Sequence, residues 1–169
     1  MPHDNVNPTA ETTPETGFFV TFEGGEGCDK GLAMQNLAQH LMDTGRTVLM
    51  TKMGGTDEGE KLRGTLVSRD TRDWEPMAEL LVFTAIRVQH INKQIKPALN
   101  LGQIVLCDRY VHSTLAYQGA AGGISEHIIR TIHNQLTDNL WPDLTIVLDI
   151  DPHIGLPRAK RKKPNSDRF

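Results

Sequence analysis

The segment that decides the fold is GFFVTFEGGEGCDKG, residues 17–31. Its first half, FFVTFE (18–23), is apolar on consecutive positions, which is typical of a parallel strand covered by helices on both faces. The glycine-rich second half leads directly into a stretch, 31–44, whose apolar residues recur at helical spacing. A strand, a glycine-rich turn and a helix in this order predict the opening unit of an α/β sheet.

The turn itself has the outline of a phosphate-binding loop with two substitutions. In the GxxxxGK[ST] pattern, glycines let backbone amides converge on phosphates, the lysine reaches the β- and γ-phosphates, and the hydroxyl holds Mg²⁺. Asp29 replaces the second glycine and Gly31 replaces the Ser/Thr, whereas Lys30 keeps its place. A plain glycine-rich turn is the alternative interpretation. The candidate loop consists of Gly24, Gly25, Glu26, Gly27, Cys28, Asp29, Lys30 and Gly31.

Strands and helices alternate through the rest of the chain. Strands are predicted at RTVLMT (46–51), QIVLCD (103–108) and LTIVLDI (144–150), and helices at 58–68, 75–100 and 124–139, the second one broken before Pro97. The order β-α-β-α-α-β-α-β predicts right-handed crossovers and a doubly wound parallel sheet, whose ligands bind beyond the carboxyl ends of the strands. We expect one domain over 17–169, preceded by a disordered polar tail at 1–16.

Composition narrows the class of protein. A chain of 169 residues with 38% apolar and 23% charged residues fits one globular domain. It contains no run approaching the ~18 apolar residues of a membrane span, and its first residues lack the basic start and apolar core of a secretory signal. The two cysteines are far apart and lack metal-site spacing. We therefore expect a soluble cytoplasmic protein.

The charge is unevenly distributed. The net charge is −3, but the last twelve residues, RAKRKKPNSDRF, carry six Lys/Arg and one Asp, a local +5, which leaves −8 for residues 1–157. A solvated terminus is the plain interpretation, and a phosphate-bearing small molecule is the functional one. Nucleic acid is a poor partner, because the basic tail has one aromatic residue and the rest of the chain is acidic.

Two further groups of residues carry recognisable chemistry. Asp108 and Arg109 end the third predicted strand, where an acid and an arginine can orient a phosphate and its metal shell. Phe83 and Arg87 are four residues apart, so on one helix they share a face and could stack on a base and hydrogen-bond its edge. A core phenylalanine beside a solvent-facing arginine is the alternative.

Taken together, these segments resemble bacterial thymidylate kinases. The resemblance rests on GFFVTFEGGEG-DK, GGT-x-x-GEKLR (54–63), AELLVFTA-RVQHI (78–91), IKPAL, CDRY-x-x-STLAYQG and PDLTIVLDIDP, and runs almost continuously from Gly17 to Phe169. AYQG following DRY is its most specific part, because adenylate, shikimate and gluconate kinases share the scaffold but not this set. The resemblance implies a P-loop nucleoside-monophosphate kinase fold, conversion of dTMP to dTDP with ATP and Mg²⁺ in dTTP biosynthesis, and a homodimer, with no nucleic acid or membrane partner.

The resemblance also implies roles for individual residues. Lys30 neutralises the transferring phosphate, Asp108 lies near Mg²⁺, and Arg109 grips the dTMP phosphate. Phe83 stacks on thymine and Arg87 hydrogen-bonds its edge. The remaining dTMP contacts come from Glu26 at the 3′-hydroxyl and from Ser113, Tyr117 and Gln118, with Tyr117 disfavouring a ribose 2′-hydroxyl. A mobile lid at about 155–169 supplies the charge that stabilises transfer through Arg158 and Arg161, next to Lys162 and Lys163.

Several departures from the family fall at functional positions. Thr51-Lys52-Met53 stands where the family has arginine, glutamate and proline, and Ile86 replaces an acidic residue. Pro157 is expected to interrupt the lid helix. By resemblance, the chain ends inside the lid and lacks the last strand and its helices.

The loop substitution leaves two functions open. A carboxylate about 5 Å from a phosphate charge costs about 3 kcal/mol at an effective dielectric of about 20, so Asp29 opposes ATP binding. One hypothesis is a dTMP kinase with impaired activity. The other is a non-catalytic thymidylate-kinase-like protein that binds dTMP or a partner subunit.

Overall fold

The computed structural model describes residues 16–67 and 74–162, so the predicted tail at 1–16 and the end of the predicted lid fall almost entirely outside the described residues. Within them, four parallel strands form one sheet in the order β2-β3-β1-β4. The strands are β1 (Phe18–Gly24), β2 (Val48–Lys52), β3 (Ile104–Asp108) and β4 (Leu144–Leu148). The predicted α/β fold with a parallel sheet is confirmed, with β2 starting two residues late and β4 ending two residues early.

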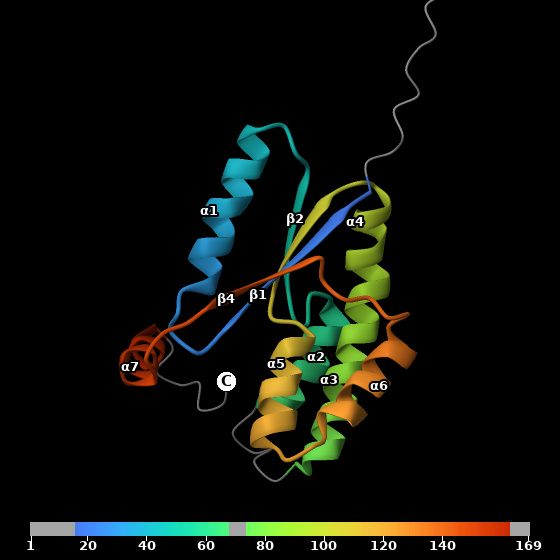
Figure 1. The fold of residues 1–169 in the computed structure, drawn as a ribbon, viewed down its shortest axis with the longest axis vertical. Helices are drawn as coiled ribbons and strands as arrows, with labels where there is room; N and C mark the ends of the chain where they lie inside the picture. Colours follow the sequence, from blue (N-terminus) through green and yellow to red (C-terminus); the bar gives the residue numbers. More distant parts are fainter. Residues whose placement is uncertain (1–15, 68–73, 163–169) are drawn as a thin grey trace, which may run out of the picture.

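Helices cover both faces of the sheet. Helix α1 and the last helix, α7, lie on one side of the strands in Figure 1, and α3 to α6 lie on the other. This arrangement is the doubly wound one that the strand pattern predicts. The helical segments are α1 (Lys30–Asp43), α2 (Asp57–Val67), α3 (Pro76–His90), η1 (Ile91–Ile95), α4 (Lys96–Asn100), α5 (Val111–Thr114), η2 (Leu115–Ala121), α6 (Glu126–Leu136) and α7 (Pro152–Lys162).

The packing of the central strands on both faces explains their apolar runs. Along β1, Phe19 packs in a buried cluster with Ile91, Ile95 and Tyr110, while its neighbour Val20 packs in a second cluster with residues of α1. Successive side chains of a strand point to opposite faces, so a strand with two covered faces carries apolar residues on consecutive positions such as Phe19 and Val20.

The helix predicted at 75–100 is not broken before Pro97. It continues through η1, a π-helical segment in which the N–H of Lys96 donates to the carbonyl of Ile91, five residues earlier. Proline has no N–H to donate and its ring crowds the carbonyl four residues back, so a widened turn lets the helix continue past Pro97.

The prediction that Pro157 interrupts the last helix is also wrong, because α7 runs through it. Pro157 is exposed on this helix, and like Pro97 it has no N–H to donate to the preceding turn. The helix start is well anchored: Asp151 accepts from the N–H of His153 through its side chain (2.8 Å) and from the N–H groups of Ile154 and Gly155 through its carbonyl.

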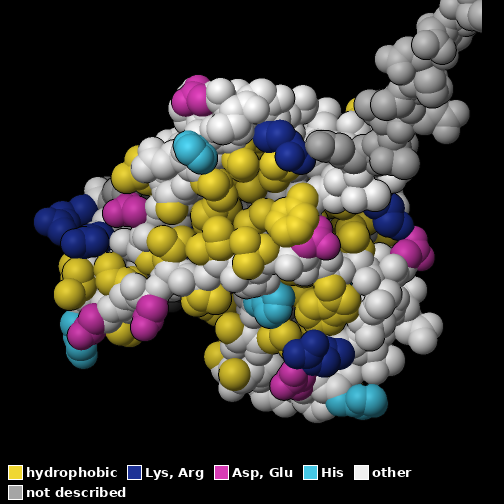
Figure 2. Space-filling model, turned by 45° about the horizontal axis from the view of Figure 1, so that its top comes forward, with side chains coloured by type: hydrophobic (Ala, Val, Ile, Leu, Met, Phe, Trp, Pro, Cys, Tyr) yellow, Lys and Arg dark blue, Asp and Glu magenta, His cyan; other side chains and the backbone are white. Residues whose placement is uncertain are grey.

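Exposed apolar side chains lie on the edge strand β4 and at the start of its neighbour β1. Leu144 and Val147 of β4 and Phe18 of β1 are 47%, 67% and 45% exposed. Figure 2 shows hydrophobic side chains gathered into a broad group on the face in view. Among the described residues, no helix has the length and apolar character needed to cross a membrane.

Candidate active site

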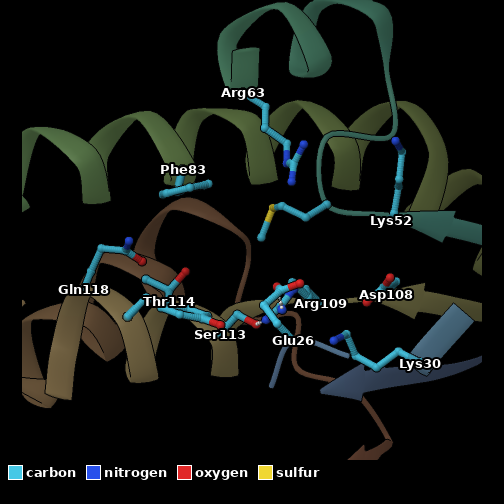
Figure 3. Close-up of a pocket in the computed structure, with 12 residues that line it drawn as sticks. Glu26, Lys30, Lys52, Arg63, Phe83, Asp108, Arg109, Ser113, Thr114 and Gln118 are labelled. Carbon is cyan, nitrogen blue, oxygen red and sulfur yellow. Dashed lines mark hydrogen bonds and ion pairs between the residues drawn. The ribbon is translucent and has the colours of Figure 1, made fainter. Parts of the chain in front are cut away.

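A cavity of about 200 Å³ lies beyond the carboxyl ends of β1, β2 and β3, where ligands of parallel α/β sheets bind. Figure 3 shows Phe83 and Gln118 at one end of it and Lys30 and Asp108 at the other. The residues that line the cavity come from the glycine-rich loop, the ends of β2 and β3, and the helices α2, α3, α5 and η2. They are Glu26, Lys30, Lys52, Met53, Arg63, Phe83, Asp108, Arg109, Ser113, Thr114, Tyr117 and Gln118.

Eight residues singled out from the sequence therefore meet at one cavity: Glu26, Lys30, Phe83, Asp108, Arg109, Ser113, Tyr117 and Gln118. Nine do not line it: six residues of the candidate loop (Gly24, Gly25, Gly27, Cys28, Asp29 and Gly31), Arg87, Arg158 and Arg161. Arg87 is buried behind the wall, and Arg158 and Arg161 are exposed on α7.

Three residues of the glycine-rich loop have a positive φ. Gly24 and Gly27 have φ values of +139° and +76°, and Asp29, at φ 59° and ψ 36°, adopts the left-handed conformation that glycine favours. Aspartate is among the few other residues that tolerate it. A Cβ at Gly31 would meet no atom within 4 Å, so the missing hydroxyl leaves open space at the start of α1.

Lys30 is turned onto its own loop. Its Nζ donates to the carbonyls of Gly24 (3.1 Å) and Gly25 (3.0 Å), and the residue is buried. Helix α7 closes the other side of the loop, because a Cβ at Gly155 would lie 2.4 Å from the carbonyl oxygen of Glu26. The loop is therefore held by its lysine and by the backbone of α7.

Arg109 is the most constrained cation of the cavity. It has a positive φ of 67°, and its guanidinium donates to Glu26 Oε1 (2.6 Å) and Ser113 Oγ (3.1 Å) and lies over the ring of Tyr117. Burial alone would lower the pKa of Arg109, but the nearby Tyr117 and carboxylates outweigh it and raise the pKa. The guanidinium is thus a fixed positive charge.

A buried glutamate supports this arrangement from behind. Glu23 accepts from Ser113 Oγ (2.6 Å) through one carboxylate oxygen and from the N–H of Tyr110 (2.8 Å) through the other. Because Ser113 donates to Glu23, its oxygen is turned to accept from Arg109. Glu23 was not predicted as a site residue, because no motif marks it beyond its place at the end of the first strand.

Asp108 offers an oxygen that the described residues leave unused. Its Oδ1 is buried and has no hydrogen-bond partner among them. Burial raises the pKa of Asp108, although Lys30 and Arg109 oppose the shift. Mg²⁺ takes oxygen ligands and keeps several waters, so one carboxylate oxygen fits a magnesium site in which phosphates and water supply the rest.

The other end of the cavity can recognise a ring with polar edges. Phe83 is half-buried on α3, and Gln118 donates to Glu79 Oε2 (2.9 Å). Arg87 donates to the hydroxyl of Thr114, which lines the cavity, so the arginine acts on the wall rather than on its surface. Burial lowers the pKa of Arg87 to about 10, which still leaves it charged at neutral pH.

Four lining residues were not predicted from the sequence: Lys52, Met53, Arg63 and Thr114. Arg63 falls inside the GEKLR segment that supports the family resemblance, and Thr114 adjoins Ser113. Both could therefore have been found from these motifs. Lys52 and Met53 had no such signal, because by resemblance they depart from the family's motif. With them, Lys30, Lys52, Arg63 and Arg109 face Glu26 and Asp108, an excess of two positive charges that favours a phosphate dianion.

A parallel doubly wound sheet with a phosphate loop after β1, and a cationic cavity at the strand ends, defines the class of P-loop nucleotide kinases. Comparison with known proteins narrows this class. The profile of the family described as "Thymidylate kinase" matches residues 22–169.

Individual relatives agree with the profile. The chain is 51% identical over 147 residues to the thymidylate kinase of Cereibacter sphaeroides (strain ATCC 17029 / ATH 2.4.9), covering 86% of this chain and 68% of that protein. It is 46% identical over 144 residues to the thymidylate kinase of Thermomicrobium roseum, covering 85% and 68%. The crystal structure of thymidylate kinase from Ehrlichia chaffeensis superposes with a TM-score of 0.75 at 33% identity, covering 88% of this chain and 89% of that one. The chain belongs to the thymidylate kinase family.

Proposed function

We propose that this chain binds dTMP in the cavity and phosphorylates it to dTDP with ATP and Mg²⁺. The observation that carries the proposal is the pairing of an aromatic, amide-lined end at Phe83 and Gln118 with a cationic end at Arg109 within one cavity. A nucleoside monophosphate has the same two ends, a flat base and a phosphate dianion. Family membership supports thymine as the base.

In this proposal the acceptor is held by charge and by stacking. Arg109 binds the phosphate of dTMP, because its guanidinium is held in a fixed position by Glu26 and Ser113. Phe83 stacks on thymine, and Tyr117 and Gln118 enclose the sugar and base. Arg87 orders the wall through Thr114. Glu26 approaches the 3′-hydroxyl.

The donor side of the proposal uses the loop and Asp108. Lys30 would exchange the carbonyls of Gly24 and Gly25 for an ATP phosphate. Asp108 would hold Mg²⁺, which would supply positive charge near the transferring phosphate. Arg158 and Arg161 close from α7, and the protein works as a homodimer in the cytoplasm, as the family resemblance implies.

A second candidate function is dTMP binding without transfer. It is favoured by a specific observation: Asp29 adopts the left-handed backbone conformation that glycine favours, and Gly31 has no hydroxyl to hold a metal. A carboxylate at this point repels ATP phosphates.

One pair of measurements decides between the two functions. Calorimetry with dTMP, thymidine and ATP measures which side of the cavity binds, and a coupled assay measures dTMP-dependent ADP formation. We expect dTMP to bind more tightly than ATP. ADP formation above background supports the kinase, dTMP binding without it supports the second candidate, and tighter binding of ATP than of dTMP contradicts the assignment of the cavity.

A further inference from the structure

A buried chain of hydrogen bonds lies beneath the loop between β2 and α2. Thr51 Oγ1 lies 2.7 Å from His90 Nε2 and donates to Gln94 Oε1 at 2.9 Å. The side-chain amide of Gln94 in turn donates to the carbonyl of Gly55. His90 is fully buried and Thr51 nearly so.

The chain of hydrogen bonds has one direction. The single proton of Thr51 goes to Gln94, so its oxygen must accept from His90, which therefore carries its proton on Nε2. Burial lowers the pKa of His90 to about 4, which keeps the ring neutral. Gly55 fits closely over the network, since a Cβ there would lie 2.5 Å from the ring of His90 and 2.8 Å from Gln94 Oε1.

The loop fixed in this way carries part of the cavity. The N–H of Met53 donates to the carbonyl of Asp108 (3.0 Å), so the loop is tied to β3 on one side and to Gln94 on the other. Lys52 Nζ pairs with Glu60 Oε1 (3.0 Å) on α2, the helix that presents Arg63 to the cavity. The loop thus sets the position of two cations at the cavity wall.

We propose that Thr51, His90 and Gln94 are positioning residues for the phosphate of the acceptor, acting through the 52–56 loop and α2 on Lys52 and Arg63. This rests on the proposed binding of dTMP. By the family resemblance, an arginine stands where this chain has Thr51. In this chain, the uncharged hydrogen-bond chain from His90 through Thr51 and Gln94 to Gly55, here called the relay, holds the 52–56 loop in place.

The test compares isosteric and conservative variants. Thr51→Val keeps the shape of the side chain and removes the relay, whereas Thr51→Ser keeps the hydroxyl. Gln94→Glu keeps the acceptor for Thr51 and removes the donor for Gly55, and Asn92→Asp makes the same change at an exposed position of the same helical segment. Calorimetry measures the affinity of each variant for dTMP and for thymidine, which lacks the phosphate.

We expect Thr51→Val and Gln94→Glu to weaken dTMP binding about tenfold and thymidine binding less than about twofold. Thr51→Ser and Asn92→Asp should stay within about twofold of wild type for both. Equal loss of dTMP and thymidine, or no loss, overturns the proposal.

A measurement without ligand separates this proposal from the proposed function. Amide hydrogen exchange across residues 52–60 should be about tenfold faster in Thr51→Val and Gln94→Glu, and unchanged in the two controls. Failure of the wild-type chain to bind dTMP would contradict the proposed function alone, whereas unchanged exchange in both variants would overturn the relay. If Thr51→Val does not fold, Gln94→Glu decides.

Discussion

At the scale of single residues, Arg109 is the cation of the cavity that we expect to bind the phosphate of dTMP. Its guanidinium is fixed by Glu26 and Ser113, so a phosphate would meet a preformed cation. We expect Arg109→Ala to weaken dTMP binding by about 1.5–3 kcal/mol, because a charge-assisted hydrogen bond is lost. Calorimetry with dTMP measures this loss. Arg130→Ala, which removes an exposed arginine paired with Glu126, should leave the affinity for dTMP unchanged. Unchanged dTMP affinity in Arg109→Ala would mean that the phosphate binds elsewhere.

The loop substitutions give a second prediction at this scale. Asp29→Gly removes a carboxylate that would repel the phosphates of ATP. Gly31→Ser adds a hydroxyl at a position where a Cβ would meet no atom within 4 Å. In the proposed donor site both residues lie at the same nucleotide, so the double variant should raise ATP affinity by more than the sum of the single variants, as measured by calorimetry.

Gly64→Ser, at another open helical position, is the control for the added hydroxyl. In the proposed function, transfer also requires Arg158 and Arg161 of α7 to close over the site, so we expect ATP binding to recover more than turnover. Full activity from the loop repair alone would contradict this division, and no gain in ATP affinity would show that Asp29 is not what opposes the nucleotide.

The sequence predicted which residues meet at the cavity better than it predicted how they act. Phe83 and Arg109 were recognisable because their motifs carry them. The i, i+4 spacing placed Arg87 on the face of Phe83, yet its guanidinium ends behind Thr114, since spacing along a helix does not fix which atoms a long side chain reaches. Lys52 could not be anticipated, because its contribution depends on where the loop after β2 turns.

At the scale of elements, the contact between α7 and the loop is closer than side chains allow. A Cβ at Gly155 would approach the carbonyl of Glu26 to 2.4 Å, so one of the two backbones must shift. We expect Gly155→Ala to lower the free energy of unfolding by about 1–3 kcal/mol, measured by urea denaturation.

Gly64→Ala is the matched control, since its Cβ meets no atom within 4 Å. It should be neutral or stabilising by up to about 1 kcal/mol, because alanine favours a helix over glycine. Equal effects of the two substitutions would mean that α7 does not rest on the loop.

Element types were predictable and element interruptions were not. Apolar patterns located all four strands of the described sheet and the long helices. Both prolines were expected to end helices, but the turn widens before Pro97 and the helix tolerates Pro157 where it is exposed. The helical segment 111–121 was missed, because AYQG lacks a clear apolar period and part of the segment is π-helical.

At the scale of the whole molecule, two buried histidines link stability to pH. Burial lowers the pKa of His90 and of His133 to about 4, whereas an unfolded histidine titrates near 6.5. Between these values the unfolded chain binds more protons, so the stability present above pH about 6.5 should fall as the pH decreases toward 4. The slope is at most about 1.4 kcal/mol per pH unit for each histidine.

Urea denaturation between pH 7 and 5 measures this slope, above the range where most carboxylates titrate. His133→Gln keeps a donor for the carbonyl of Leu140 and should reduce the slope, whereas His153→Gln, at an exposed position, should leave it unchanged. An identical slope in wild type and His133→Gln would exclude His133 as a source.

The order of the sheet has a consequence for synthesis of the protein. β1 pairs with β3 at Phe18–Ile104 and with β4 at Val20–Leu144. The strand that is translated first therefore pairs only with strands that are translated at least 80 residues later. Until they leave the ribosome, the apolar run of β1 has no sheet to join, and exposed strands of this kind invite aggregation. A nascent chain stalled before residue 104 should therefore depend on chaperones to stay dispersed, and one released after β4 should not.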